Sequence, residues 1–261
     1  MLESTPRQIS ITRRNLMAAV SIAVIAAQTR IASAARPDNP GKGHAFGHEK
    51  GKRLHCFLRG TKILTPQGER EVSLLSPGEH IITHSGRSKP VKWIGRRLFE
   101  RPATGWPLEV IPIKIARSAL APNVPHADLY VSRAHAIFVD GFLIQVGSLT
   151  NGSTIVAADA DSSEVLEYFH VQLSDHDVIL ANGAPTETLI PSADHAQFDN
   201  TFYASPTEAQ SHLTVISMTG GRQQLRSRLR SALSPIVDLR SPFDKTRDRL
   251  EERGHWMRVA A

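Results

Sequence analysis

The chain has 261 residues, enough for one large or two small domains, and its 41% hydrophobic and 21% charged residues are ordinary for a globular protein. Its 17 glycines, 16 prolines and only 6% aromatic residues favour many short strands and turns over long helices. The formal net charge of +6 would fit a nucleic-acid-binding protein, but ten basic and five acidic residues between Gly220 and Ala261 account for +5 of it. The segment lacks the aromatic interleaving pattern that would suggest base stacking. A solvated helical face is the better interpretation, and no nucleic-acid partner is expected.

The first residues resemble an export signal. The pair Arg13-Arg14 precedes an apolar stretch, Ala18–Ala27, which is shorter than the roughly 20 residues that span a bilayer. Ala32–Ala34 then fits the small-x-small cleavage rule. We therefore expect residues 1–34 to be a twin-arginine-like signal peptide of an exported, periplasmic or secreted, protein without stable membrane insertion. An amphipathic or transit-type leader is the alternative.

The segment 35–55 is rich in glycine, lysine and proline and has no apolar period, which predicts disorder. From Gly60 to about Ile190, turn dipeptides such as Asp140-Gly141 separate short apolar runs, and this pattern predicts an all-β domain. The runs expected to form strands include residues 80–83, 91–98, 110–115, 129–131, 136–139, 165–173 and 178–181.

The β region also contains an internal repeat. Residues 72–81 align without gaps with residues 146–155, and valine, leucine, glycine and isoleucine coincide at four positions. In each copy an apolar strand and a glycine turn precede the valine. We interpret this as a duplicated strand-turn-strand unit, for which chance likeness of two hairpins is the alternative.

Beyond Pro191 the pattern changes. The run 213–218 could form one more strand. Leucines four residues apart predict a helix over 222–233, and a second, charged helix is expected over 244–253. The predicted organisation is thus a signal peptide (1–34), a disordered segment (35–55), a β domain (56–190) and a partly helical, basic C-terminal extension (191–261).

Cys56 is the only cysteine, and it stands at the entry to the β domain. Because it cannot form an internal disulfide, it packs, binds something or reacts. Further along, the run Ser132-Arg133-Ala134-His135 holds a hydroxyl and an imidazole three residues apart. A cysteine at the first residue of a domain, together with such a pair, suggests self-directed acyl chemistry. At these residues the chain resembles the Hedgehog/intein (Hint) family, specifically its bacterial intein-like members.

The resemblance implies a horseshoe-like, pseudo-twofold β fold, in which the internal repeat is expected. It also implies that the Cys56 thiol attacks the carbonyl of His55 and converts the peptide bond to a thioester. A thiol is only partly ionised at neutral pH, but the target is covalently held in place, and the departing nitrogen needs a general acid. The resemblance implies that His135 is that acid and that Ser132 helps to hold the bond in a strained form.

A later segment, residues 167–183, is similar to the family motif that returns a histidine or aspartate to the active cleft. His170 and His176 are the candidates from this segment, with Asp175 or Asp177 orienting an imidazole. A polar rim without a catalytic role is the alternative interpretation.

The chain also departs from the family. Inteins end in a His-Asn pair followed by Cys, Ser or Thr, whereas residues 184–191 contain no such pair. Splicing is therefore not expected, and nothing in the sequence supports sterol activation as in Hedgehog proteins. What remains is an N-to-S acyl shift at Cys56 and cleavage of the His55–Cys56 bond in cis. The N-terminal segment would be the substrate, water or a small nucleophile would release it, and no cofactor or metal is implied.

Three alternatives stay open at this point. A catalytically silent Hint-fold binding module would keep the fold without the chemistry. A zinc site could use His44, His48, His55 and Cys56, which are ligand types in one stretch. A conventional cysteine hydrolase would use His135 as the base toward an external substrate.

Overall fold

The computed structural model describes residues 54–190, 195–201, 213, 215–216, 221–234 and 238–259. The chain divides into two compact units, Met1–His48 and Glu49–Ala261, and all described residues belong to the second. The predicted signal peptide and all but the last two residues of the segment 35–55 lie outside the described residues.

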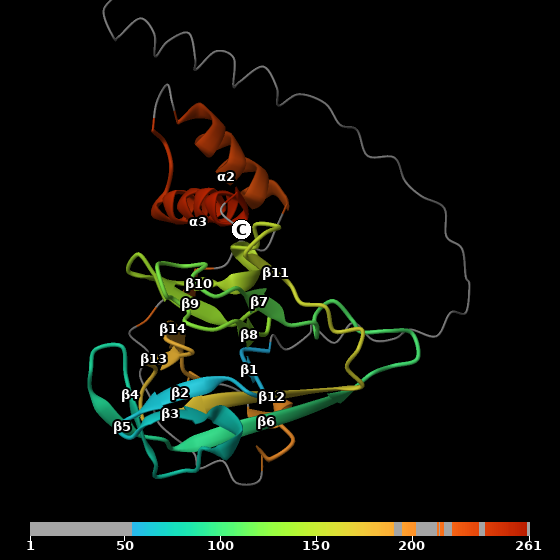
Figure 1. The fold of residues 1–261 in the computed structure, drawn as a ribbon, viewed down its shortest axis with the longest axis vertical. Helices are drawn as coiled ribbons and strands as arrows, with labels where there is room; N and C mark the ends of the chain where they lie inside the picture. The colour runs from blue at the N-terminus through green and yellow to red at the C-terminus, as the bar shows by residue number, and fades with distance from the viewer. Residues whose placement is uncertain are drawn as a thin grey trace, which may run out of the picture. The chain divides into compact units, whose positions relative to one another are not determined.

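Short strands dominate the described part, as the all-β prediction requires (Figure 1). They are β1 Phe57–Leu58, β2 Lys62–Thr65, β3 Gly68–Glu71, β4 His80–Ile82, β5 Ser88–Pro90, β6 Trp93–Glu100, β7 Ile113–Ile115, β8 Leu129–Val131, β9 Ala136–Val139, β10 Phe142–Gln145, β11 Ile155–Ala157, β12 Val165–Gln172, β13 Val178–Ala181, β14 Ala184–Glu187 and β15 Val215–Ile216. The predicted strands 129–131, 136–139 and 178–181 match β8, β9 and β13 residue for residue.

Two large sheets and one small one contain these strands. The first runs in the order β11-β7-β8-β1-β12-β6, the second in the order β15-β10-β9-β14-β13-β2-β3, and β4 pairs with β5. The longest strands, β6 and β12, lie side by side over eight residue pairs (Figure 1). Apolar side chains from both large sheets form one core cluster, whereas Cys56 belongs to a second cluster with Trp93, Tyr168 and Phe198.

The strand β1, only two residues long, has the most important position, because it lies between β8 and β12. Phe57 pairs with the last residue of β8 on one side and with Phe169 of β12 on the other, both antiparallel. Continuing each antiparallel register by one residue puts Cys56 between Ser132 and His170. The sheet order therefore brings together three candidate residues that lie far apart in the sequence.

The internal repeat is visible in the backbone. The hairpin β2–β3 leads into the 3-10 turn η1, Val72–Leu74, and the hairpin β9–β10 leads into η2, Val146–Ser148. The first N–H of η1 donates to the carbonyl of Thr61, and the first N–H of η2 donates to that of His135. Both pairs share one offset (146 − 72 = 135 − 61 = 74). His135 thus occupies, in the second half, the place that Thr61 has in the first.

One strand boundary and one further strand differ from the sequence-based expectation for identifiable physical reasons. The strand predicted over 110–115 begins only at Ile113, because the N–H of Val110 turns back to the carbonyl of Pro107 and Pro112 has no N–H to donate. The strand β14 was not predicted. It forms because the Asn182-Gly183 turn, with both residues at positive φ, folds the chain back along β13.

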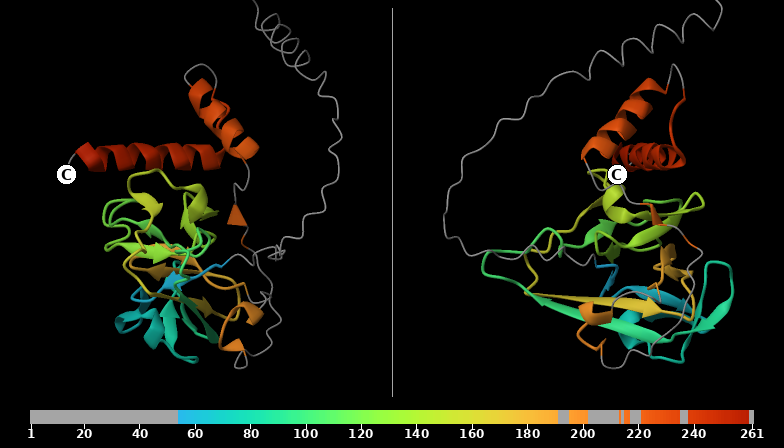
Figure 2. Two further views of the ribbon diagram at one scale, coloured as in Figure 1. Left: turned by 90° about the vertical axis from the view of Figure 1, so that its right-hand side faces the viewer. Right: turned by 180° about the vertical axis from the view of Figure 1, so that it is seen from behind.

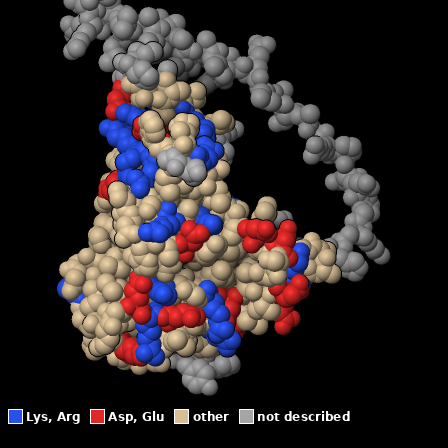
Figure 3. Space-filling view, viewed as in Figure 1, with Lys and Arg blue, Asp and Glu red and all other residues tan. Residues whose placement is uncertain are grey.

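Both predicted C-terminal helices are present, as α2 (Gly221–Leu233) and α3 (Pro242–Val259), the second longer than expected. Figure 2 shows them next to one another, beyond the β9–β10 hairpin. On the face in Figure 3, basic side chains gather over these helices, whereas over the sheets acidic side chains are interspersed with them. Of the predicted strand 213–218, β15 is described and pairs with β10. Among the described residues, no helix combines the length and apolarity that crossing a membrane requires.

Candidate functional site

The peptide bond between His55 and Cys56 is held by Ser132. The Cys56 N–H donates to Ser132 Oγ over 2.8 Å, and Ser132 Oγ–H donates to the Leu54 carbonyl over 2.6 Å. The Ser132 N–H also donates to the Cys56 carbonyl over 2.8 Å. Because the one hydroxyl proton points to Leu54, Ser132 orients the bond and has no proton left for the Cys56 nitrogen.

Two buried imidazoles lie next to this bond. The rings of His135 and His170 are 5.1 Å apart in a T-shaped arrangement, and the ring of Phe57 lies 4.4 Å from that of His135. Neither histidine has a ring nitrogen with a hydrogen-bond partner of normal geometry within the described residues. Buried polar groups without partners are rare in folded proteins and often mark functional sites.

Burial decides the charge of these imidazoles. It lowers the pKa of His135 to about 4, although the Glu187 carboxylate and the backbone of His55 both raise it. Burial, with His135 as its neighbour, also lowers the pKa of His170 well below its usual range. Both rings are therefore neutral at pH 7, and a neutral imidazole can accept a proton and pass it on.

The Cys56 side chain is fully buried against apolar neighbours. Burial raises the pKa of its thiol far above the ordinary value, and the opposing effect of Arg97 does not compensate. The thiol is therefore protonated in the folded protein. It can act as a nucleophile only if a neighbouring group removes its proton during the reaction.

Glu187, in β14, is a site residue that the sequence analysis missed. Its Oε1 accepts the Ala136 N–H at 2.7 Å and lies 2.9 Å from His55 Nδ1, and its Oε2 lies 3.5 Å from His176 Nε2. Only 1% of its side chain is exposed. Burial favours the neutral acid, but His176 and His55 outweigh burial and hold the pKa of Glu187 below its usual range. The sequence carried one weak signal, a carboxylate four residues after the Asn182-Gly183 turn.

The late histidines have different positions. His170 lies in the cluster with His135, whereas His176 reaches the site through Glu187. The aspartates expected to orient an imidazole do something else: Lys89 Nζ lies 2.7 Å from Asp175 and 2.6 Å from Asp177. That expectation was wrong, because strand β5 brings a lysine to this turn, which sequence distance did not reveal.

The structure thus brings Cys56, Ser132, His135 and His170 together around one peptide bond and adds Glu187 behind it. Within the described ranges, no group of three or more His, Cys, Asp or Glu side chains could hold a metal ion. His44 and His48 of the alternative zinc site lie outside the described residues.

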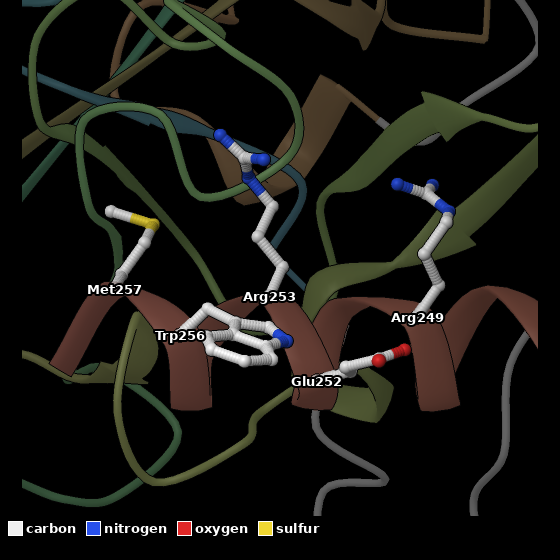
Figure 4. A pocket seen from close by; sticks show the side chains of 5 residues that line it. All are labelled: Arg249, Glu252, Arg253, Trp256 and Met257. Carbon is white, nitrogen blue, oxygen red and sulfur yellow. The ribbon is translucent and has the colours of Figure 1, made fainter. Parts of the chain in front are cut away.

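A surface pocket lies elsewhere, on α3. Figure 4 shows its lining residues, Arg249, Glu252, Arg253, Trp256 and Met257. Its two arginines already have partners in the β domain. Arg249 forms an ion pair with Asp140, and Arg253 donates a hydrogen bond to the carbonyl of Ser118. None of the lining residues belongs to the group around the His55–Cys56 bond.

Comparison with known proteins identifies the family. Residues 55–193, more than half of the chain, match the family described as Hint domain. No curated protein matches the chain.

Solved structures with a similar fold include inteins. They include the intein-like domain from Clostridium thermocellum (13% identity, 52% of this chain and 98% of that one, TM-score 0.38), the MchDnaB-1 intein carrying N145AA (14%, 51% and 99%, 0.36) and a DnaB intein from Synechocystis sp. PCC 6803 (12%, 52% and 99%, 0.34). These values are too low to argue a function, so the family assignment rests on the match over residues 55–193. The chain belongs to the Hint domain family.

Proposed function

We propose that this domain cleaves its own chain between His55 and Cys56 by an N-to-S acyl shift, without splicing. The observation that carries the proposal is the Ser132 hydrogen bond to the Cys56 nitrogen, next to two buried, neutral imidazoles. The scissile bond, its holder and a proton carrier are then all inside one folded domain. The N-terminal segment ending at His55 is the substrate, and the reaction runs once per chain.

The acyl shift moves one bond and one proton. The Cys56 sulfur attacks the carbonyl carbon of His55, the bond from that carbon to the Cys56 nitrogen breaks, and a thioester with a free amine results. The thiol proton leaves the sulfur and ends on the departing nitrogen. Neutral His135 can serve as base and then as acid for that one proton.

Hydrolysis completes the reaction. Water adds to the thioester carbonyl, the carbon–sulfur bond breaks, and the products are a carboxylate at His55 and the restored Cys56 thiol. The absence of an asparagine in residues 184–191 supports cleavage over splicing, because no side chain there can cyclise. In its place the segment supplies Glu187.

Intact mass spectrometry of the full chain tests the proposal. Incubation with hydroxylamine should yield a fragment beginning at Cys56 and a complementary hydroxamate at His55, because hydroxylamine attacks a thioester but not an ordinary amide. Cys56→Ala removes the nucleophile and should abolish both products. An uncleaved wild-type chain over days, with and without hydroxylamine, would overturn autoprocessing and leave a Hint-fold binding module.

A further inference from the structure

We propose that Glu187 forms a recognition subsite for the side chain that precedes the scissile bond, and that this subsite selects histidine at position 55. The inference rests on the proposed cleavage reaction and names its substrate preference. It assigns to a buried carboxylate, far away in sequence, the task of reading the last residue of the released segment.

The carboxylate is held in place by groups other than the substrate. The N–H of Ala136 donates to Oε1, and His176 Nε2 lies on the side of Oε2. Strand pairing sets this geometry, since Thr186 of β14 pairs with Ile137 of β9 and the next step along the register brings Glu187 to Ala136. The acceptor therefore has a fixed position next to the strand that follows His135.

His55 makes the contact from the substrate side. Its Nδ1 lies 2.9 Å from Oε1. An ionised carboxylate only accepts hydrogen bonds, so the proton of this bond is on His55 Nδ1. About a quarter of the His55 side chain (27%) is exposed, against 1% for Glu187, so the substrate side chain enters from the surface and meets an anion buried in the domain.

The contact bears directly on the reacting atom. The carbonyl of His55 is the target of the thiol, and the backbone of His55 lies close enough to His135 to affect its pKa. Anchoring the side chain of residue 55 fixes the orientation of that carbonyl toward the proton carrier, which is how a positioning contact accelerates a reaction.

The chemistry of the subsite defines the side chains that fit. It takes a hydrogen-bond donor of imidazole reach, neutral or cationic. Alanine at position 55 leaves the anion without its partner, and aspartate there adds a second carboxylate next to it, which the buried site disfavours. We therefore expect the wild-type chain to cleave fastest, His55→Ala to cleave more slowly, and His55→Asp to be the slowest of the three.

Position 55 and Glu187 are tested together by comparing cleavage rates in hydroxylamine. With Glu187 present, His55→Ala should slow cleavage roughly ten- to hundredfold, the range for a hydrogen bond to a charged group. In the Glu187→Met background, which removes both acceptor oxygens at similar side-chain length, adding His55→Ala should slow cleavage little further, so that the ratio of the two rates falls toward one. If Glu187 were only structural, its loss would slow both chains equally and the ratio would persist, which would overturn the subsite.

Glu167→Met is the matched control. Glu167 is another buried carboxylate, with 8% exposure, but it pairs with Arg59 and Arg96 rather than with a histidine. This variant should retain the preference for histidine at position 55 even if it cleaves more slowly. A preference that vanished in both variants would show a general effect of losing a buried charge and would also overturn the subsite.

A second readout needs no cleavage. In Cys56→Ala protein, nitrogen-detected NMR of the histidine rings reports which nitrogen of His55 carries the proton, with His55→Ala assigning the signal. The Nδ1-protonated form should dominate, and adding Glu187→Met, which leaves no acceptor on that side chain, should remove that preference. This result separates the two proposals. An uncleaved wild-type chain in which His55 keeps the Nδ1 proton overturns autoprocessing but leaves the contact between His55 and Glu187 standing. Loss of the Nδ1-protonated preference in the chain with Glu187 present overturns the subsite.

Discussion

At the scale of single residues, the site combines groups that each carry a cost for stability. His135 and His170 are buried without hydrogen-bond partners of normal geometry among the described residues. Such groups lower the stability of a fold, and they are typically kept where function needs them. The neutral state of the imidazoles also makes their effect on stability depend on pH.

The protein should lose stability as the pH falls from about 6.5 to about 4. In the unfolded chain His135 takes up a proton near pH 6.5, whereas in the folded chain its pKa is about 4. Protons therefore bind preferentially to the unfolded state in this window, at a cost of about 2 kcal/mol at pH 5 for one such group. Urea denaturation of Cys56→Ala protein at pH 7 and pH 5 measures the loss.

His135→Gln in the same background should reduce, but not abolish, the acid sensitivity, because His170 has a similarly lowered pKa. Glu187 does not interfere, since its pKa is also lowered and its stabilising contribution is lost only at lower pH, as the pH falls through the folded value. An unchanged difference between the two pH values in His135→Gln would contradict this account.

At the scale of elements, the turn between β8 and β9 positions the chemistry. The His135 N–H closes the turn on the carbonyl of Ser132, and η2 clamps it from outside. There the N–H of Val146 donates to the carbonyl of His135, and the N–H of Gly147 donates to the carbonyl of Arg133, both over 2.9 Å. The turn η2, which belongs to the second half of the repeat, therefore supports the turn between β8 and β9.

Gly147→Ala should disturb this clamp. A Cβ there would lie 2.5 Å from Arg133 Cγ and 2.9 Å from its carbonyl oxygen, closer than real Cβ contacts. We expect a loss of about 1–3 kcal/mol in the free energy of unfolding. Cleavage should also be slower in this variant than in one that is destabilised at least as much at a position away from the site. Ile81→Ala, at a fully buried position in β4, is the comparison, because this change costs about 2–5 kcal/mol and destabilises the domain at least as much. Equal cleavage rates in the two variants would argue against the clamp.

At the scale of the whole molecule, the helical extension is attached to the β domain through apolar and polar contacts. Phe243 and Leu250 of α3 belong to the main core cluster. Thr246 Oγ1 donates to Asp140 over 2.7 Å, and Arg249 reaches the same carboxylate, which lies in the turn of the β9–β10 hairpin. Gly254 of α3 lies against Asn151, Ser153 and Thr154. None of these contacts touches the site around Cys56.

Gly254→Ala should therefore loosen α3 and leave cleavage intact. A Cβ at 254 would meet the side chains of Ser153, Asn151 and Thr154, so the helix must shift away from the domain. Hydrogen exchange of α3 should become faster by roughly tenfold or more, equivalent to about 1.4 kcal/mol of lost protection. Glu252→Ala, at an exposed position of the same helix, should not change it. Slower cleavage in Gly254→Ala would instead reveal coupling between extension and site.

The sequence by itself determined what depends on local pattern. Turn dipeptides and alternating apolar residues located β8, β9 and β13, because a strand and its turns are set by nearest neighbours. The position of Cys56 before the first strand and the spacing of Ser132 and His135 indicated the family, and the repeat indicated the duplicated half.

Tertiary structure alone decided which distant side chains meet. The pairing of His55 with Glu187 joins residues 132 positions apart and depends on the registers of β14 with β9 and β13. The partner of Asp175 and Asp177 is Lys89 for the same reason. Local patterns specify that a segment is a strand, but the register between strands is fixed by packing of the whole core, where a slip of one residue turns every side chain to the other face.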